Sequence, residues 1–312
     1  MINLVTGGAG FIGSNLIQKL LNDKEKVFCI DNFCTGSKRN IEHFIDHPNF
    51  TFINQDICKP INLNVDRIWH FASPASPIYY QENPIETTKT IFLGTQQMLE
   101  MAKKNNCRIL IASSSEIYGL TSNNSQSEEQ LGYIDTVSRR SCYGEAKRLS
   151  ETISFDYFRE YKLDIRVVRL FNTYGPKMLP KDGRVISNFI WNPLNKEDIE
   201  IFGSGEQTRS FCFIDDIIDG LVKLMDSNYN YPINLGNPFE EHSINNLFKI
   251  IQEILNDKLT VKYSDPREYD VLKRKPNIAK ANRILNWEPK TTLKIGLLKT
   301  IKYFKKEKKY DY

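Results

Sequence analysis

The chain has 312 residues, of which 40% are hydrophobic and 26% are charged, and its formal net charge is only +4. A chain of this length and composition can bury a large core, which excludes a disordered or fibrous protein. The small net charge gives no reason to expect a nucleic-acid partner. No apolar run is long enough to span a membrane, so we expect no membrane partner either.

The six cysteines and four histidines show neither CxxC spacing nor a recognisable pattern of metal ligands. The sequence therefore predicts free thiols, no bound metal and a cytoplasmic location. Because the first strand-like run starts at residue 2, we expect no signal or transit peptide. The basic run 305–309 is predicted to be a solvated tail beyond the last helix.

The stretch 6–13, TGGAGFIG, follows an apolar run at 2–5 and opens a helix-like run. This order predicts a loop that binds the diphosphate of a dinucleotide, because glycines let phosphates approach the backbone and a helix N-terminus offers free N–H groups. A second apolar run, 26–30, ends at Asp31, about twenty residues beyond the glycines. A carboxylate there can accept hydrogen bonds from both ribose hydroxyls, which favours NAD over NADP.

Further along the chain, short apolar runs alternate with longer amphipathic stretches. The strand-like runs are 50–53, 67–71, 108–112 and 165–170, and the helix-like stretches include 85–102 and 145–161. This alternation predicts right-handed βαβ units and hence an α/β fold of the Rossmann type, a doubly wound parallel sheet with helices on both faces.

After residue 170 the regular alternation ends, and the stretch 172–209 is rich in Gly, Pro, Asn and Lys. A helix is predicted over 211–226, and a strand over 233–236 that returns to the sheet. We therefore predict an NAD-binding Rossmann domain and a smaller interleaved C-terminal lobe for the substrate. The domain covers 1–172 plus about 211–236, and the lobe covers about 173–210 plus 237–312. The ligand is expected above the carboxyl ends of the strands.

Tyr143 and Lys147 are four residues apart, so on a helix both side chains face the same side. The lysine and the nicotinamide charge would lower the pKa of the tyrosine, whose phenolate could then take a proton from a sugar hydroxyl while hydride leaves for NAD. The alternative is an ordinary tyrosine and lysine on a helix, because YxxxK is common by chance.

A polar cluster, SSSEIYG at 113–119, follows the predicted strand 108–112. Such strand ends line active sites in open parallel sheets. Ser114 is expected to hydrogen-bond the reacting hydroxyl, with Ser115 and Glu116 facing the sugar beyond it. The alternative is that these serines only satisfy nearby backbone groups.

Together these motifs resemble those of the extended short-chain dehydrogenase/reductases that modify nucleotide sugars. Within that superfamily the chain most resembles the UDP-glucuronate decarboxylase (UDP-xylose synthase) family, from residue 2 to about residue 304. The motifs that carry the resemblance are GGAGFIG (7–13), FASPASP (71–77), SSSEIYG (113–119), YGEAKR (143–148), RLFNTYGP (169–176) and QTRSFCFIDD (207–216).

Ser115 is the position that separates related activities. The sugar 4,6-dehydratases carry Asp-Glu here, whereas the decarboxylases carry Ser-Glu, as this chain does at Ser115 and Glu116. The resemblance implies NAD-dependent decarboxylation of UDP-glucuronate to UDP-xylose through a 4-keto intermediate, with NAD regenerated in each cycle. It implies that Tyr143 acts as the base. It also implies that Glu116 and Arg209 interact with the substrate carboxylate and take part in returning the proton to the sugar.

Two other readings stay open. One is a UDP-glucuronate 4-epimerase, or another epimerase or dehydratase of nucleotide sugars. The other is a nucleotide-binding sensor without catalysis, although such a protein has no need of a tyrosine and a lysine that relay protons.

The motifs and the resemblance together predict two sets of binding residues. The cofactor residues are Gly7, Gly10, Phe11, Ile12, Gly13, Asp31, Asn32, Thr35, Gly36, Asp56, Ile57, Ala72, Tyr143 and Lys147. The substrate residues are Asn172, Arg184, Asn188, Arg209 and Arg274. The four-helix interface of relatives implies a homodimer through the stretches 85–102 and 145–161.

The chain departs from the family pattern at two places. Between the catalytic tyrosine and lysine it has Gly144, Glu145 and Ala146, where the group usually has Asp-Glu-Gly. Ile91 occupies a helix position where relatives often have Asn. The second departure leaves open how local hydration or helix packing differs near the active site.

Overall fold

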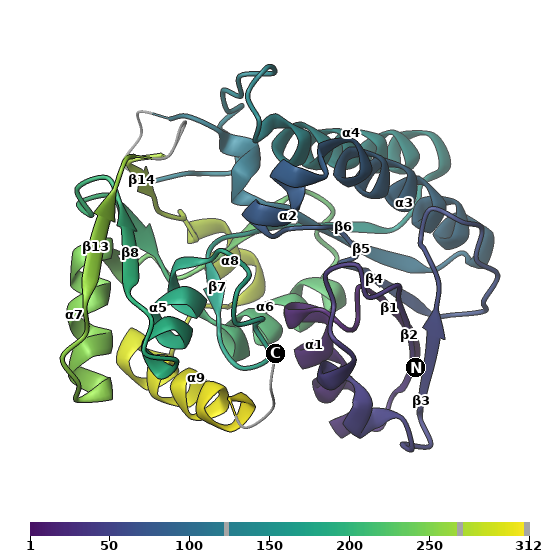
Figure 1. The fold of residues 1–312 in the computed structure, drawn as a ribbon. Helices are drawn as coiled ribbons and strands as arrows, with labels where there is room; N and C mark the ends of the chain where they lie inside the picture. Colours follow the sequence, from purple (N-terminus) through teal and green to yellow (C-terminus); the bar gives the residue numbers. More distant parts are fainter. Residues whose placement is uncertain (122–124, 267–270, 309–312) are drawn as a thin grey trace.

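The fold is built around one parallel sheet, which confirms the predicted doubly wound architecture (Figure 1). The computed structural model describes residues 1–121, 125–266 and 271–308. In order across the sheet the strands are β11 (Ile233–Leu235), β6 (Ile165–Leu170), β5 (Arg108–Ser114), β4 (Arg67–His70), β1 (Ile2–Thr6), β2 (Lys26–Asp31) and β3 (Phe50–Asn54). Every neighbouring pair is parallel, and the strand order reverses beside β1. Ligands bind at such reversals, at the carboxyl ends of the strands.

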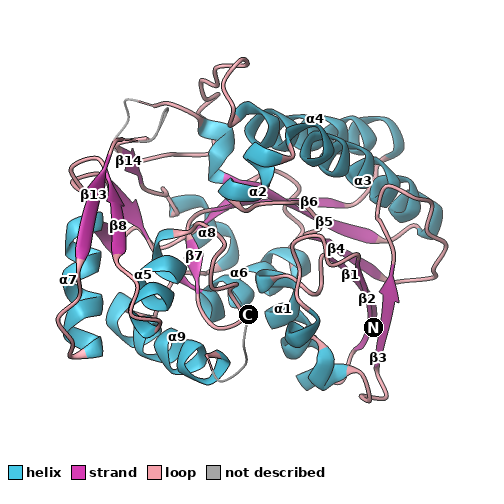
Figure 2. Ribbon diagram, in the orientation of Figure 1, coloured by secondary structure: helices cyan, strands magenta, loops and turns pink. Residues whose placement is uncertain are grey.

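Both faces of the sheet are buried, because successive side chains of a strand point to opposite sides. In β1, Leu4 packs in one apolar cluster and Val5 in the other, and in β5 the neighbours Ile109 and Leu110 divide in the same way. Helices supply the other half of each cluster (Figure 2). One face carries α1 (Phe11–Asn22) and α6 (Ile214–Asp226), and the other carries α3 (Pro84–Asn105) and α4 (Ser141–Tyr161). The short helix α2 (Pro77–Glu82) precedes α3.

The C-terminal part of the chain adds short strands and helices beside the sheet, at the left of Figure 1. The strands are β7 (Thr173–Tyr174) with β10 (Cys212–Phe213), β8 (Ile199–Phe202) with β13 (Val261–Ser264), and β9 (Thr208–Ser210) between β12 (Glu241–Ser243) and β14 (Lys273–Arg274). The helices are α5 (Val185–Leu194), α7 (Ile244–Leu255), α8 (Ala279–Leu285) and α9 (Leu293–Glu307).

Three predictions about elements need correction. The helix predicted over 211–226 begins only at Ile214, because residues 212–213 form β10 beside β7. The connections around β3 hold no α-helix in the described residues: 55–66 are irregular, and the β2–β3 segment holds only the 3-10 turns η1 (Lys38–Asn40) and η2 (Glu42–Phe44). The basic run is not a tail, because α9 continues to Glu307; Lys309 lies outside the described residues.

The predicted return strand at 233–236 is confirmed as β11, which pairs with β6. The six cysteines are free. Within the described part of the chain, no helix combines the length and the hydrophobicity that a membrane span requires.

Candidate active site

The loop between β1 and α1 is shaped for close approach of a ligand to its backbone. Gly7 has a φ of +69°, and a Cβ there would lie 2.8 Å from the Cα of Ala72. A Cβ on Gly13, in the first turn of α1, would lie 2.8 Å from the Cα of Gly8. Side chains at these two positions would fill the cradle, and the N-terminus of α1 beside it favours an anion. This part of the site fits the diphosphate of a dinucleotide.

Asp31 ends β2 and lines the same cavity as the glycine loop. Its carboxylate accepts hydrogen bonds from the backbone N–H groups of Ala9, at 3.0 Å, and Phe33, at 2.8 Å. Burial raises the pKa of Asp31, against these backbone N–H groups, which lower it. Gly36 faces the carboxylate: a Cβ there would lie 2.9 Å from Asp31 Oδ1. The space beside the Asp31 carboxylate is therefore open only because residue 36 has no side chain.

Tyr143 and Lys147 lie one turn apart in α4, and both are buried. Lys147 Nζ donates to the carbonyl oxygen of Ala112 in β5 at 2.7 Å and lies 5.8 Å from the centroid of the Tyr143 ring. Burial lowers the pKa of Lys147 to about 7, although the nearby carboxylate of Glu151 acts in the opposite direction. A lysine at this pKa is close to losing its proton at neutral pH.

The pKa of Tyr143 is subject to opposing effects from its surroundings. Burial raises it, and a hydrogen bond with Ser114 acts in the opposite direction but does not outweigh burial. The protein's own residues therefore raise this pKa, because the phenol is desolvated on the covered side of α4, and the predicted lowering, which includes the charge of the nicotinamide, stays a prediction.

Ile91 belongs to a small apolar cluster around the tyrosine. It packs in α3 with Tyr80, Tyr143 and Ala146. The rings of Tyr80 and Tyr143 are stacked, with centroids 5.2 Å apart and planes 8° apart. The packing answers the question that Ile91 left open, because its side chain extends the apolar surface around the phenol of Tyr143.

Glu116 lies in the 3-10 turn η3 (Ser115–Tyr118), directly after β5. Its Oε1 accepts a hydrogen bond from Nη2 of Arg140 at 3.0 Å and also meets Nη1 of Arg274. Burial by itself would raise the pKa of Glu116, but Arg274 and Arg140 outweigh it and hold this pKa at about 2. Glu116 is therefore ionised at neutral pH.

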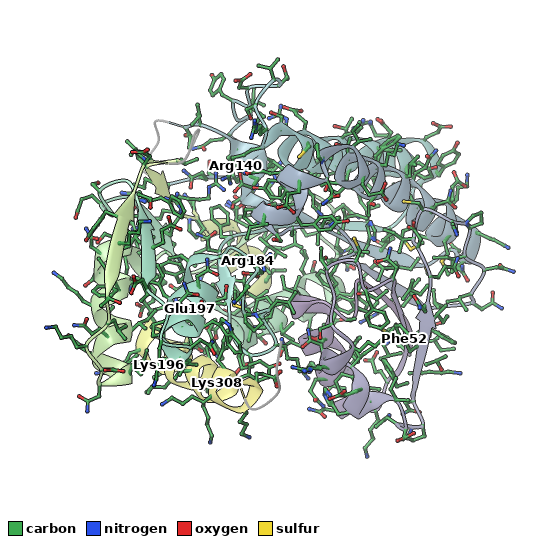
Figure 3. The ribbon with its side chains drawn as sticks, in the orientation of Figure 1. Phe52, Arg140, Arg184, Lys196, Glu197 and Lys308 are labelled. Atoms are coloured by element: carbon green, nitrogen blue, oxygen red, sulfur yellow. The ribbon has the colours of Figure 1, made fainter. Side chains whose placement is uncertain are left out.

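The remaining predicted substrate residues come from the C-terminal elements and the segments that lead to them. Arg184 caps α5, donates to the Asp182 carboxylate at 2.6 Å and also to the carbonyl oxygen of Ala75. Arg209 in β9 donates to the carbonyl oxygen of Thr208 at 2.7 Å. Figure 3 labels Arg184 near the centre of the molecule, together with Arg140.

One cavity of about 650 Å³ brings all the predicted site residues together. On the cofactor side its lining includes the glycine loop and the end of β2, and on the sugar side it includes Ser115 and Glu116. The residues of the predicted sets that line it are Gly7, Gly10, Phe11, Ile12, Gly13, Asp31, Asn32, Thr35, Gly36, Asp56, Ile57, Ala72, Ser114, Ser115, Glu116, Tyr143, Lys147, Asn172, Arg184, Asn188, Arg209 and Arg274.

Arg140 also lines this cavity and was not predicted from the sequence, and Tyr80, which the sequence allows either near the sugar or as a packing residue, lines it as well. Arg140 stands three residues before Tyr143, so its position one helical turn away was a usable signal. The stacking of Tyr80 on Tyr143 had no such signal, because this contact joins two different helices. In the described residues, no group of three or more His, Cys, Asp or Glu side chains is placed to hold a metal ion.

The parallel sheet, the glycine loop and the tyrosine–lysine pair at one cavity define a Rossmann-type, dinucleotide-dependent enzyme of the extended short-chain dehydrogenase/reductase class. The family model described as GDP-mannose 4,6 dehydratase matches residues 4–300. UDP-glucuronic acid decarboxylase 1 of Xenopus tropicalis is 47% identical over 304 residues, which cover 97% of this chain and 72% of that protein. UDP-glucuronic acid decarboxylase 3 of Arabidopsis thaliana is 46% identical over 295 residues, which cover 94% of this chain and 86% of that one. The chain therefore belongs to the GDP-mannose 4,6-dehydratase family and, within it, to the UDP-glucuronic acid decarboxylases.

Among solved structures, the chain is similar to the UDP-glucuronic acid 4-epimerase of Bacillus cereus in complex with UDP-glucuronic acid and NAD. The TM-score is 0.89 at 29% identity, over 98% of this chain and 99% of the epimerase. The UDP-glucose 4-epimerase of Thermotoga maritima with UDP-glucose gives a TM-score of 0.89 at 31% identity, over 98% of this chain and 99% of that chain.

Proposed function

We propose that this chain is an NAD-dependent decarboxylase that converts UDP-glucuronate to UDP-xylose. The observation that carries the proposal is a single cavity that joins the glycine loop to Tyr143, Glu116 and Arg209. Its relatives named UDP-glucuronic acid decarboxylases, at up to 47% identity, support the same substrate and reaction.

NAD fits the cofactor end of the cavity. The glycine cradle at Gly7 and Gly13 would hold the diphosphate, and Asp31 would receive the ribose hydroxyls. The carboxylate of Asp31 would repel the 2′-phosphate of NADP. When bound, NAD supplies the chemistry of accepting a hydride from carbon 4 of the sugar and returning it in the same cycle.

Tyr143 would take the proton of the hydroxyl on carbon 4, with Ser114 as its hydrogen-bond partner. Loss of this proton and of a hydride leaves a ketone at carbon 4, β to the carboxylate. The bond between carbon 5 and the carboxyl carbon then breaks, carbon dioxide leaves, and the electron pair moves onto the ketone oxygen as an enolate. Hydrogen bonds from Tyr143 and Ser114 stabilise that enolate more than the starting hydroxyl. Protonation of carbon 5 and return of the hydride give the pentose.

The carboxylate of the sugar would lie near Arg209, since guanidinium groups pair with carboxylates. Glu116 is ionised, so it would act first as a hydrogen-bond acceptor toward the sugar or a water molecule, and could deliver a proton to carbon 5 only after receiving one. Asn172, Arg184, Asn188 and Arg274 line the cavity and would contact the nucleotide.

We also propose that the chain forms a homodimer through α3 and α4. These helices pack together on one face of the sheet, and each leaves a leucine exposed, Leu93 in α3 and Leu149 in α4. Exposed apolar side chains on two adjacent helices suit a four-helix interface with a second copy.

The test is incubation of the purified protein with UDP-glucuronate labelled at the carboxyl carbon and with NAD in catalytic amount. We expect labelled carbon dioxide in stoichiometry with UDP-xylose, and no net accumulation of NADH. Interconversion of sugar epimers without release of label would instead establish a 4-epimerase. Tight binding of both nucleotides without turnover would establish a sensor.

A further inference from the structure

Arg140 and Arg274 meet the same carboxylate oxygen of Glu116 from two different parts of the fold. Arg140 directly precedes α4 and stands one turn before Tyr143. Arg274 belongs to β14, where it pairs in register with Arg209 of the parallel strand β9. All of these residues line the cavity, and Figure 3 labels Arg140 above the centre of the molecule.

The pairing of β14 with β9 places Arg274 beside a second arginine, Arg209. Residues in register on neighbouring parallel strands face the same side, so Arg274 and Arg209 present two guanidinium groups to the cavity from one small sheet. Adjacent guanidinium groups suit the oxygens of a phosphate or a carboxylate. An anionic group of a substrate would therefore compete with Glu116 for Arg274.

Arg140 is placed differently, because its local sequence ties it to the catalytic helix. Glu116 follows β5 and Arg140 precedes α4, and these two elements also carry Ser114 and Tyr143. The ion pair of Glu116 with Arg140 therefore joins the two elements that hold the proton-transfer groups, whereas its pair with Arg274 crosses the cavity to the β9–β14 sheet.

We infer that Arg140 is a positioning residue, which holds the Glu116 carboxylate beside Tyr143 when Arg274 turns to an anionic group of the substrate. The inference rests on the proposed function, because it assigns Glu116 a place next to the reacting sugar. Without Arg140, the substrate would leave Glu116 as a desolvated charge with no cation. Such a group either takes up a proton or turns toward water.

The groups around Glu116 agree with this assignment. The charged and titratable side chains that interact with it electrostatically include Arg140 just before α4, Tyr143 from α4, Arg274 from β14 and Tyr80 from α2. Since only the two arginines among them favour the ionised carboxylate, loss of one and recruitment of the other should raise the pKa of Glu116.

The experiment compares Arg140→Gln with Arg139→Gln, a matched control at the exposed neighbouring arginine. With saturating UDP, the carboxyl signal of Glu116 is followed by carbon-13 NMR in protein labelled at glutamate side chains, and Glu116→Gln assigns the signal. We expect Arg140→Gln to raise the pKa of Glu116 by at least about one unit, the lower end of the effect of a close opposite charge. The control should leave it unchanged.

Turnover supplies the second measurement. Arg140→Gln should lower kcat at least ~10-fold and change the dissociation constant of UDP less than ~2-fold, whereas Arg274→Gln should mainly weaken UDP binding. Arg140→Lys keeps the charge and should recover part of the lost kcat, and it carries the test if the glutamine variant does not fold.

An unchanged pKa of Glu116 in Arg140→Gln, or a kcat equal to that of the Arg139→Gln control, overturns the inference. Failure of the proposed function gives a different result. The wild-type protein would then release no carbon dioxide, while the carboxyl titration would still report whether Arg140 governs Glu116.

Discussion

Tyr143 is held by three neighbours of different kinds: the Ser114 hydroxyl, the Tyr80 ring and the Lys147 ammonium one turn away. Tyr143→Phe keeps the ring, its stacking and its burial, and removes only the oxygen that accepts the proton. We therefore expect turnover to fall at least ~100-fold, within the range for loss of a general base, with NAD binding within ~2-fold of wild type. Tyr133→Phe, at an exposed position, is the control. Near-normal turnover of a folded Tyr143→Phe protein would mean that another group takes the proton.

Lys147 makes a prediction about stability, because burial lowers its pKa from 10.5 to about 7. Below about pH 7 the lysine is charged in the folded and the unfolded protein, so the full cost of burying the charge opposes folding. Between about pH 7 and 10.5 the folded protein binds fewer protons than the unfolded one, so the free energy of unfolding rises with pH. Lys147→Met should remove this rise.

The rise of the free energy of unfolding with pH can be measured by denaturant unfolding of the cofactor-free protein at pH 6 and pH 9. The wild type should gain stability over this range relative to Lys147→Met, which itself should be inactive. Parallel pH dependence of the two proteins would show that Lys147 keeps its ordinary pKa in the fold.

The site residues predicted from the sequence share a property: each belongs to a local pattern. Gly7, Gly13, Asp31 and the pair Tyr143 and Lys147 could be found because spacing along the chain fixes which side chains share a face or a loop. The stacking of Tyr80 on Tyr143 and the effect of burial on the pKa of Tyr143 could not, because both depend on how α2, α3 and α4 pack against one another.

At the scale of elements, the β1–α1 loop leaves little room for an added side chain. In Gly13→Ala the new methyl would meet the Gly8 Cα at 2.8 Å, so the loop must shift. In Gly10→Ala the nearest atom would be 3.1 Å away, and Gly10 has a negative φ of −78°. We expect Gly13→Ala to raise the dissociation constant of NAD at least ~10-fold, about 1.4 kcal/mol, and Gly10→Ala to raise it less. Equal affinities in the two variants, measured by calorimetry, would contradict a tight cradle at Gly13.

The strands of the large sheet were predictable because parallel strands buried on both faces form continuous apolar runs. The start of α6 was not, since Phe211 and the two residues of β10 are as apolar as the helix that follows. Only the pairing of β10 with β7, 39 residues earlier in the chain, separates them. The connection between β3 and β4, which the structure describes throughout, holds no α-helix, and this too could not be predicted. The periodicity of the apolar residues indicates the two strands but not the conformation of the segment that joins them.

At the scale of the whole molecule, the cavity draws its lining from both the large sheet and the small strands β8, β9 and β14. The interleaved chain whose second unit caps the strand ends stays a prediction from the sequence. The facing of Arg274 toward Glu116 could not be predicted, because the two residues are 158 positions apart and no local pattern links them.

The homodimer is the prediction that concerns the whole surface. Leu93 is 38% exposed in α3 and Leu149 is 43% exposed in α4, whereas Met98 and Leu99 of α3 and Tyr157 of α4 are buried against the sheet. If these leucines are covered by the same helices of a second copy, the wild-type protein should sediment at about 73 kDa, twice 36.3 kDa. Leu149→Asp would place a carboxylate in that apolar contact, and in a symmetric dimer it would do so twice. We therefore expect this variant to sediment as a monomer at micromolar concentration.

Ile295→Asp is the control, because this residue is 51% exposed on α9, away from both helices. A wild-type monomer would rule out the dimer, whereas a dimer that Leu149→Asp leaves intact would place its interface on another face of the molecule.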